Sequence, residues 1–224
     1  MRRGPSEEPG MHTERDNSNA SMMGAQLNRV PRCPHCGVAS PHLFRVWASS
    51  GGTVRNDGGQ TSNWAAYCCT ACGAISTVSG RWNGKQFDVT GIFPAPKTAH
   101  EDLPDRLRTY LQQAYQTLSA PDAAAMVAGS AVDAMLKEVG YPDGSLYSRI
   151  DKAVADAVLT KGMGEWAHAV RLGSNRPRHA DADEPHVAPA QAAQSVEFAE
   201  ALGNFLFVLT KKIERGIEAA TPSA

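Results

Sequence analysis

The chain has 224 residues, with 22 Lys and Arg against 23 Asp and Glu and a formal net charge of -1. This length suits one or two domains, and the near-neutral balance excludes a strong overall attraction to nucleic acid, so any such binding must use a local cationic patch. The sequence has no apolar run near the roughly 18 residues of a membrane span and no apolar signal-peptide core, so we expect a cytoplasmic protein without a membrane partner.

The first part of the chain changes from a polar tail to β-strand patterns. Residues 1–28 are rich in Gly, Pro, Ser and Asn without apolar periodicity, which predicts a disordered N-terminal tail. Apolar and aromatic runs then predict strands at 43–47, 64–67, 74–82 and 85–93. Asn83-Gly84 predicts a hairpin between the last two strands, because both residue types tolerate a positive φ. The polar, Gly-rich segment 49–60 predicts a loop.

Two Cys-x-x-Cys-Gly segments lie within this β-region and suggest a metal site. They are formed by Cys33 and Cys36 with Gly37, and by Cys69 and Cys72 with Gly73. The two-residue spacing lets both thiolates of a pair face one ion, and the glycine permits the tight turn around it. Four thiolates complete the tetrahedral coordination of Zn²⁺, so we expect a structural zinc ribbon over residues 29–96, with no open position for catalysis.

The cysteines also permit other interpretations. In a reducing cytoplasm, Cys-x-x-Cys pairs are metal sites or redox dithiols more often than structural disulfides, and incidental cysteines are a further alternative. Cys68 could replace Cys69 only by spoiling the two-residue spacing, so we expect it to stand outside the site. His35 lies inside the first pair, and we expect it to be exposed and not a ligand.

A Pro-Ala-Pro segment at 94–96 ends the β-pattern and predicts a domain junction. Residues 97–218 are Ala-rich and show helical spacing, which predicts an all-α domain, and residues 219–224 are predicted to form a disordered tail. The class is therefore α+β. Helices are predicted at 104–115, from Pro121 (with Ser119 as a possible cap) to a stop at Gly140, over 146–158, and at 163–172 and 189–217.

Three polar residues recur every four positions between the last two predicted helices: Arg171, Asn175 and His179. On a continuous helix these side chains would share a face. Gly173 and Pro177 instead predict a helix end followed by a loop, because glycine weakens a helix and proline removes one of its hydrogen bonds.

Arg176 and Arg178 join Arg171 in the clearest local cationic patch and are candidates to meet phosphates. Two interpretations of this segment remain open. In the first, it is a helix junction in which Arg171 pairs with a carboxylate and Asn175 turns the loop. In the second, it is an RNA-binding or phosphodiester-cleaving centre, in which His179 is the general acid or base and Arg171 stabilises the charged transition state.

The order of these motifs resembles the prokaryotic domain-of-unknown-function family 4145, placed in the HEPN-like superfamily. The resemblance covers about residues 30–216 and is carried by "EDLP" at 101–104, "SAPDAAAM" at 119–126 and "VRLGSN…RHADADEP" at 170–185. It implies a helical bundle whose members often pair, so a homodimer through the helical domain is expected.

The resemblance also implies two functional hypotheses. Many HEPN-like proteins are metal-independent endoribonucleases of defence systems that act through Arg, a nearby polar residue and His; here Arg171, Asn175 and His179 are the candidates. Seven residues separate Arg171 from His179, against about four to six in those enzymes. The alternative is a non-catalytic adaptor that dimerises and recruits or regulates a protein partner, such as a defence nuclease.

Overall fold

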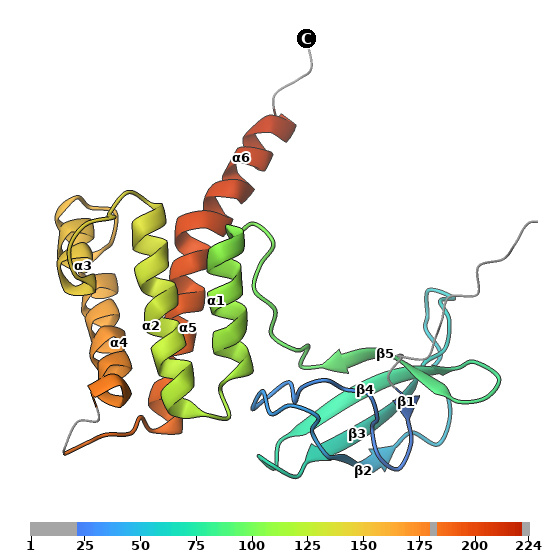
Figure 1. The fold of residues 1–224 in the computed structure, drawn as a ribbon. Coiled ribbons are helices and arrows are strands. Elements are labelled where there is room, and N and C mark those ends of the chain that lie inside the picture. Colours follow the sequence, from blue (N-terminus) through green and yellow to red (C-terminus); the bar gives the residue numbers. More distant parts are fainter. Residues whose placement is uncertain (1–21, 180–182, 221–224) are drawn as a thin grey trace, which may run out of the picture.

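A computed structural model describes residues 22–179 and 183–220, and it has a β-module followed by a helical bundle (Figure 1). The predicted α+β class is therefore confirmed. No helix among the described residues is long and apolar enough to cross a membrane.

The β-module is an antiparallel sheet of five strands within the described part of the chain, in the order β1-β5-β4-β3-β2. Its strands are β1 (Met22–Met23), β2 (Leu43–Ala48), β3 (Asn63–Cys69), β4 (Ile75–Trp82) and β5 (Phe87–Phe93). The predicted hairpin is confirmed, because Trp82 pairs with Phe87 and the Asn83 amide donates to the Gln86 carbonyl at 3.0 Å. Gly84 has φ 100°, a backbone conformation that glycine adopts without strain.

Residues 22–28, which the sequence predicts to be disordered, belong to the sheet. Met22 and Met23 form β1 against β5, and the Leu27 amide donates to the Leu43 carbonyl on the free edge of β2. Leu27 is buried with Val30, Leu43, Tyr67 and Val78 in the core of the module. Packing of Leu27 and Met23 against the core and hydrogen bonds to strand edges therefore order this segment, although its composition is polar. The rest of the predicted tail, 1–21, and residues 221–224 lie outside the described residues.

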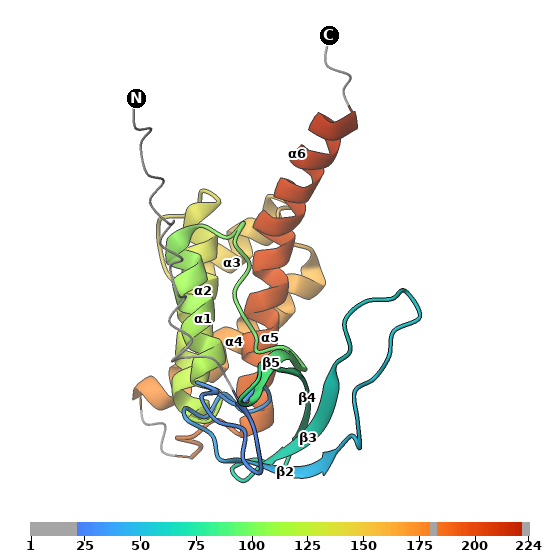
Figure 2. The same ribbon diagram turned by 90° about the vertical axis from the view of Figure 1, so that its right-hand side faces the viewer.

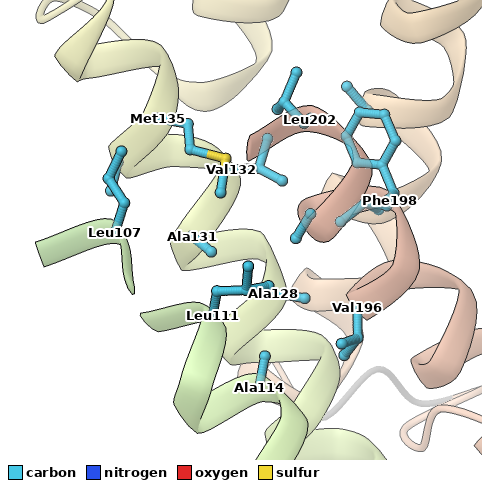
Figure 3. Close-up of a cluster of buried hydrophobic side chains, with 14 of the residues drawn as sticks. Leu107, Leu111, Ala114, Ala128, Ala131, Val132, Met135, Val196, Phe198 and Leu202 are labelled. Carbon is cyan, nitrogen blue, oxygen red and sulfur yellow. The ribbon is translucent and has the colours of Figure 1, made fainter. Parts of the chain in front are cut away.

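The helical bundle is built around α2. The described helices are α1 (Asp105–Gln116), α2 (Pro121–Glu138), α3 (Leu146–Ala155), α4 (Lys161–His179), α5 (Pro189–Gly203), the π-helical turn η2 (Asn204–Val208) and α6 (Leu209–Ala220). α2 packs on α1, α3, α4 and α5 through buried alanines such as Ala128 and Ala131 (Figure 3). Its small side chains permit close approach: a Cβ on Gly129 would lie 2.6 Å from the Cβ of Ser174 on α4.

The ends of α2 are largely as expected. Pro121 is its first residue, where a missing amide hydrogen costs nothing, and Gly140 follows its end with φ 101°. Ser119 does not cap it, because Ala120 holds the cap position without a side-chain hydrogen bond.

α4 differs from the prediction, since it continues past Leu172 to His179 without a break. Val170 and Ser174 are buried, and this packing offsets the roughly 1 kcal/mol that Gly173 costs in a helix. Pro177 lies in the last turn, where only one backbone hydrogen bond is lost.

The predicted final helix is divided into α5, η2 and α6. α5 packs in the bundle, whereas α6 projects beyond it (Figure 2) and has no buried residue. Phe205, Leu209 and Ile213 follow helical spacing here and are exposed. Toward its far turns, the Arg215 guanidinium of α6 donates two hydrogen bonds to the Asp102 carboxylate, at 2.7 and 2.8 Å.

Candidate metal centre and a cationic cleft

The four cysteines predicted as ligands lie together. The Sγ atoms of Cys33, Cys36, Cys69 and Cys72 are all within 4.8 Å of one another. Sulfur atoms at about 2.3 Å from a tetrahedral Zn²⁺ are separated by about 3.8 Å, so small adjustments suffice to close the site. The cluster could therefore hold a metal ion and is compatible with zinc.

Each cysteine pair sits on a tight turn that aims its thiols inward. The Gly37 amide donates to the Cys33 carbonyl at 3.0 Å, and the Gly73 amide donates to the Cys69 carbonyl at 2.8 Å. Both glycines have positive φ, 70° and 73°. Cys68 points elsewhere, with its thiol 3.4 Å from the Gly73 carbonyl, and His35 is exposed; neither belongs to the cluster.

The electrostatics of the cluster favour a cation. Burial raises the pKa of the Cys33 thiol, and it raises the pKa of Cys36 to about 12, with the neighbouring Cys72 and Cys33 thiols adding to the shift. A divalent ion that binds here must displace the protons of these thiols, because thiolates are the ligating form of cysteine. Metal affinity at this site should therefore fall as the pH falls, because protons compete for the same sulfur atoms.

The first cysteine turn also contacts the helical bundle. Nη1 of Arg32 donates to the carbonyls of both Gly37 and Gln116, each at 2.9 Å. A Cβ on Gly37 would lie 2.6 Å from the Tyr115 carbonyl oxygen, so only glycine fits between the turn and the end of α1. Arg32 thus satisfies a C-terminal carbonyl of α1 from the other module.

A cationic cleft of about 520 Å³ lies on the bundle between α1, α2, α4 and the beginning of α3. Basic residues from three helices line it: Arg106 of α1, Lys137 of α2, and Arg171 and Arg178 of α4. Asp133 is the one acidic residue in this lining. The N-terminal end of α3 adds its partial positive charge at Ser145–Tyr147, where Ser145 and Ser148 form a capping box.

Arg171 is held in the cleft by stacking. Its guanidinium carbon lies 5.2 Å from the centre of the Tyr147 ring, and Tyr147 in turn lies 4.9 Å from the His168 ring. Nε of Arg171 is buried and has no hydrogen-bond partner among the described residues. The guanidinium therefore lies over the Tyr147 ring, and this contact leaves its charge available to an anion.

Asp133, the acidic residue that lines the cleft, is paired with two basic residues. Nη1 of Arg149, which is 8 % exposed, donates to Asp133 at 2.7 Å, and Lys137 pairs with the same carboxylate. Arg149 also donates to the carbonyls of Tyr141 and Pro142 at 3.0 and 2.9 Å. Since Asp133 has its own buried partner, the cations of the cleft exceed its acidic charge.

The structure separates the residues singled out in the sequence. Arg171, Asn175 and Arg178 line the cleft, because the continuous α4 places them on one face. His179 is exposed in the last turn and is not among the lining residues. Arg176 lies toward α5 and pairs with Glu184 at 2.7 Å, so it does not line the cationic cleft with Arg178.

Sequence reasoning missed Arg106, Lys137 and Tyr147. Each lies on a different element from the Arg-rich segment, and none stands in a motif. The sequence shows only that each of these residues lies on the polar face of its own helix. It does not show that the three faces come together in the fold.

The fold and its two sites define a metal-compatible β-module joined to a helical bundle with a cationic cleft. Residues 112–219 match the model of a family described as a domain of unknown function (DUF4145), and this match supports that family for the helical part of the chain. Searches among curated proteins and among solved structures found no match.

Proposed function

We propose that this protein binds RNA through the cleft of its helical domain and that Zn²⁺ on the four cysteines stabilises its β-module. The module is then a zinc ribbon and the bundle an HEPN-like domain, as the sequence resemblance implies. Zinc bound by four thiolates has no open position, so its contribution is to the stability of the β-module.

The observation that carries the proposal is the convergence of Arg106, Lys137, Arg171 and Arg178 on one cleft. Phosphate groups supply most of the affinity of proteins for nucleic acid, and basic side chains on several elements can follow a backbone of repeated phosphates. Tyr147 is half-exposed beside Arg171 and offers a ring on which an unpaired base can stack. An unstacked base next to a phosphate is a feature of single-stranded RNA.

Removing cleft charges is expected to weaken RNA binding and its salt dependence. For Arg106→Gln and Arg178→Gln we expect the Kd to rise roughly 3- to 10-fold each, with the log-log salt slope reduced by about 1 for each lost phosphate contact. Fluorescence anisotropy with labelled single-stranded RNA at several salt concentrations measures both quantities. Lys161→Gln, at the exposed start of α4, is the control and should bind like the wild type. Unchanged affinity and slope in the cleft variants would refute the cleft as the RNA site.

RNA cleavage is a finer hypothesis, motivated by Arg171, Asn175 and His179. It requires the exposed His179 to reach an RNA held by Arg171 and Asn175. Incubation of the protein with RNA in magnesium-free buffer tests it. Cleavage by the wild type that is lost in Arg171→Ala and in His179→Ala supports the hypothesis, and equal activity in all three opposes it.

A second candidate function, a dimerising adaptor, is favoured by the exposed apolar residues of η2 and α6. Phe205 of η2 and Leu209 and Ile213 of α6 are 43 to 53 % exposed, and α6 projects from the bundle (Figure 2). If this stripe forms a homodimer or holds a protein partner, Ile213→Asp should lower the molar mass measured by light scattering. Lys212→Asp, next to it in the sequence, is the matched control. A monomeric wild type that binds RNA tightly would count against the adaptor.

A further inference from the structure

The outer face of the β-sheet carries a group of aromatic side chains. The core of the module, with Leu43, Tyr67 and Val78, lies on one face of the sheet, and strand alternation places the intervening residues on the other. The register places four aromatic residues of β2, β3 and β5 on this outer face: Phe44, Trp47, Trp64 and Phe93. We call these four residues the aromatic face.

The rings of the aromatic face are open to solvent. Trp47 is 56 % exposed, Phe93 is 50 % and Phe44 is 40 %. Trp64 and Phe93 contact each other with ring centroids 5.8 Å apart. Small residues lie between the rings: Ala66 and Thr77 separate Trp47 from Phe93 across the sheet. Aromatic rings spread over a flat surface of small side chains leave their π-faces accessible to a planar ligand.

The module that carries this face is strongly basic, unlike the whole chain. Residues 22–96 contain six Lys and Arg against two Asp and Glu, a formal charge of +4 from these side chains. Residues 97–220 contain 13 Lys and Arg against 17 Asp and Glu. Both acidic residues of the module are bound locally: Asp57 pairs with Arg55, and Asp88 accepts from the amides of Asn83 and Gln86 at 2.8 and 2.9 Å. Arg81 is exposed and, by alternation along β4, lies at the end of the outer face.

We propose that the aromatic face is a binding surface for single-stranded nucleic acid, whose unpaired bases stack on Trp47, Phe44 and Phe93. The positive field of the module attracts the phosphate backbone, and the rings bind the bases without reading their sequence. Duplex bases are stacked on each other and cannot reach these rings, so the surface selects single strands. A second copy of the module is disfavoured as occupant, because two modules of the same net positive charge repel.

This proposal is independent of the cleft, since the two sites lie on different modules and depend on different residues. Stacking on a ring depends little on salt, whereas phosphate contacts in the cleft set the salt slope. The structure also offers a matched control. Trp82 is 57 % exposed, like Trp47, but alternation places it with Val78 and Gly80 on the core side of the sheet.

The test is fluorescence anisotropy of zinc-loaded full-length protein with labelled single-stranded RNA of mixed sequence and with the matching duplex. We expect Trp47→Ala to weaken single-strand binding roughly 5- to 100-fold with an unchanged salt slope, and Trp47→Phe to restore most of it. Phe44→Ala should weaken it too. Trp82→Ala should bind like the wild type, and duplex affinity should be the same in all variants.

Several results would overturn the proposal. Wild-type RNA affinity in Trp47→Ala and Phe44→Ala would show that the aromatic face does not bind RNA. An equal loss of RNA affinity in Trp47→Ala and Trp82→Ala would show that the effect is a general loss of structure and not a loss of this surface. A wild-type dimer that Trp47→Ala converts to a monomer identifies the face as a protein interface. If Trp47→Ala binds RNA more weakly while the cleft variants bind like the wild type, the aromatic face is supported as the RNA site and the cleft is refuted. If only the cleft variants bind more weakly, the cleft is supported and the aromatic face is refuted.

Discussion

Removal of the metal is expected to unfold the β-module while the helical bundle stays folded. Among the described residues, the hydrophobic core of the module has only eight buried members, and Cys33 and Cys69 are two of them. Binding of zinc to four cysteines in small domains is worth about 10 to 16 kcal/mol at neutral pH, more than so small a core supplies. Without the ion, the thiols of Cys33 and Cys69 are left buried without a ligand.

Tryptophan fluorescence and amide NMR spectra, recorded during chelation, measure this loss. Trp47, Trp64 and Trp82 report on the β-module, and Trp166 reports on the bundle. Cys33→Ser should reproduce the chelated state, whereas Cys68→Ser, whose thiol stands outside the cluster, should keep both the metal and the fold. A chelated protein with an unchanged spectrum would show that the ion contributes nothing to stability.

Arg149→Ala is expected to lower the free energy of unfolding of the bundle by about 3 kcal/mol, because it removes the mostly buried partner of Asp133 and leaves that partly buried carboxylate with Lys137 alone. Its guanidinium binds Asp133 and the carbonyls of Tyr141 and Pro142, so the substitution leaves one carboxylate and two carbonyls short of donors. Urea unfolding followed by far-ultraviolet circular dichroism measures the change.

Lys152→Ala provides the control for Arg149 on the same helix. Lys152 pairs with Asp156 one turn away at 3.0 Å, and both side chains are exposed. Exposed pairs of this kind contribute about 0.3 to 0.5 kcal/mol, so this variant should unfold close to the wild-type midpoint. Equal losses in the two variants would mean that burial of Arg149 has no energetic role.

The elements with strong local signals could be predicted from the sequence. The hairpin at Asn83-Gly84 and the grouping of the four cysteines depend on turn chemistry and on spacing, which a sequence displays directly. The course of α4 could not be predicted in this way. Gly173 and Pro177 locally favour a helix end, and only the packing of Val170 and Ser174 against the bundle overrides them.

The candidate RNA site was predictable in part. Arg171, Asn175 and Arg178 are close in sequence and lie together, whereas Arg106 and Lys137 reach the cleft through the packing of α1 and α4 on α2. The basic character of the β-module could have been read from the sequence, but only by counting charges for each domain separately. The net charge of -1 conceals two halves of opposite sign.

The contact of Arg32 with Gln116 bears on how the protein can be divided for study. A cut through the Pro-rich junction at 94–96 would leave the last turn of α1 without a donor for its carbonyl and the Cys33–Gly37 turn without its support. Each fragment would then expose a surface that is covered in the whole chain. Fragments that aggregate or bind weakly would report on this severed contact before they report on the function of either half.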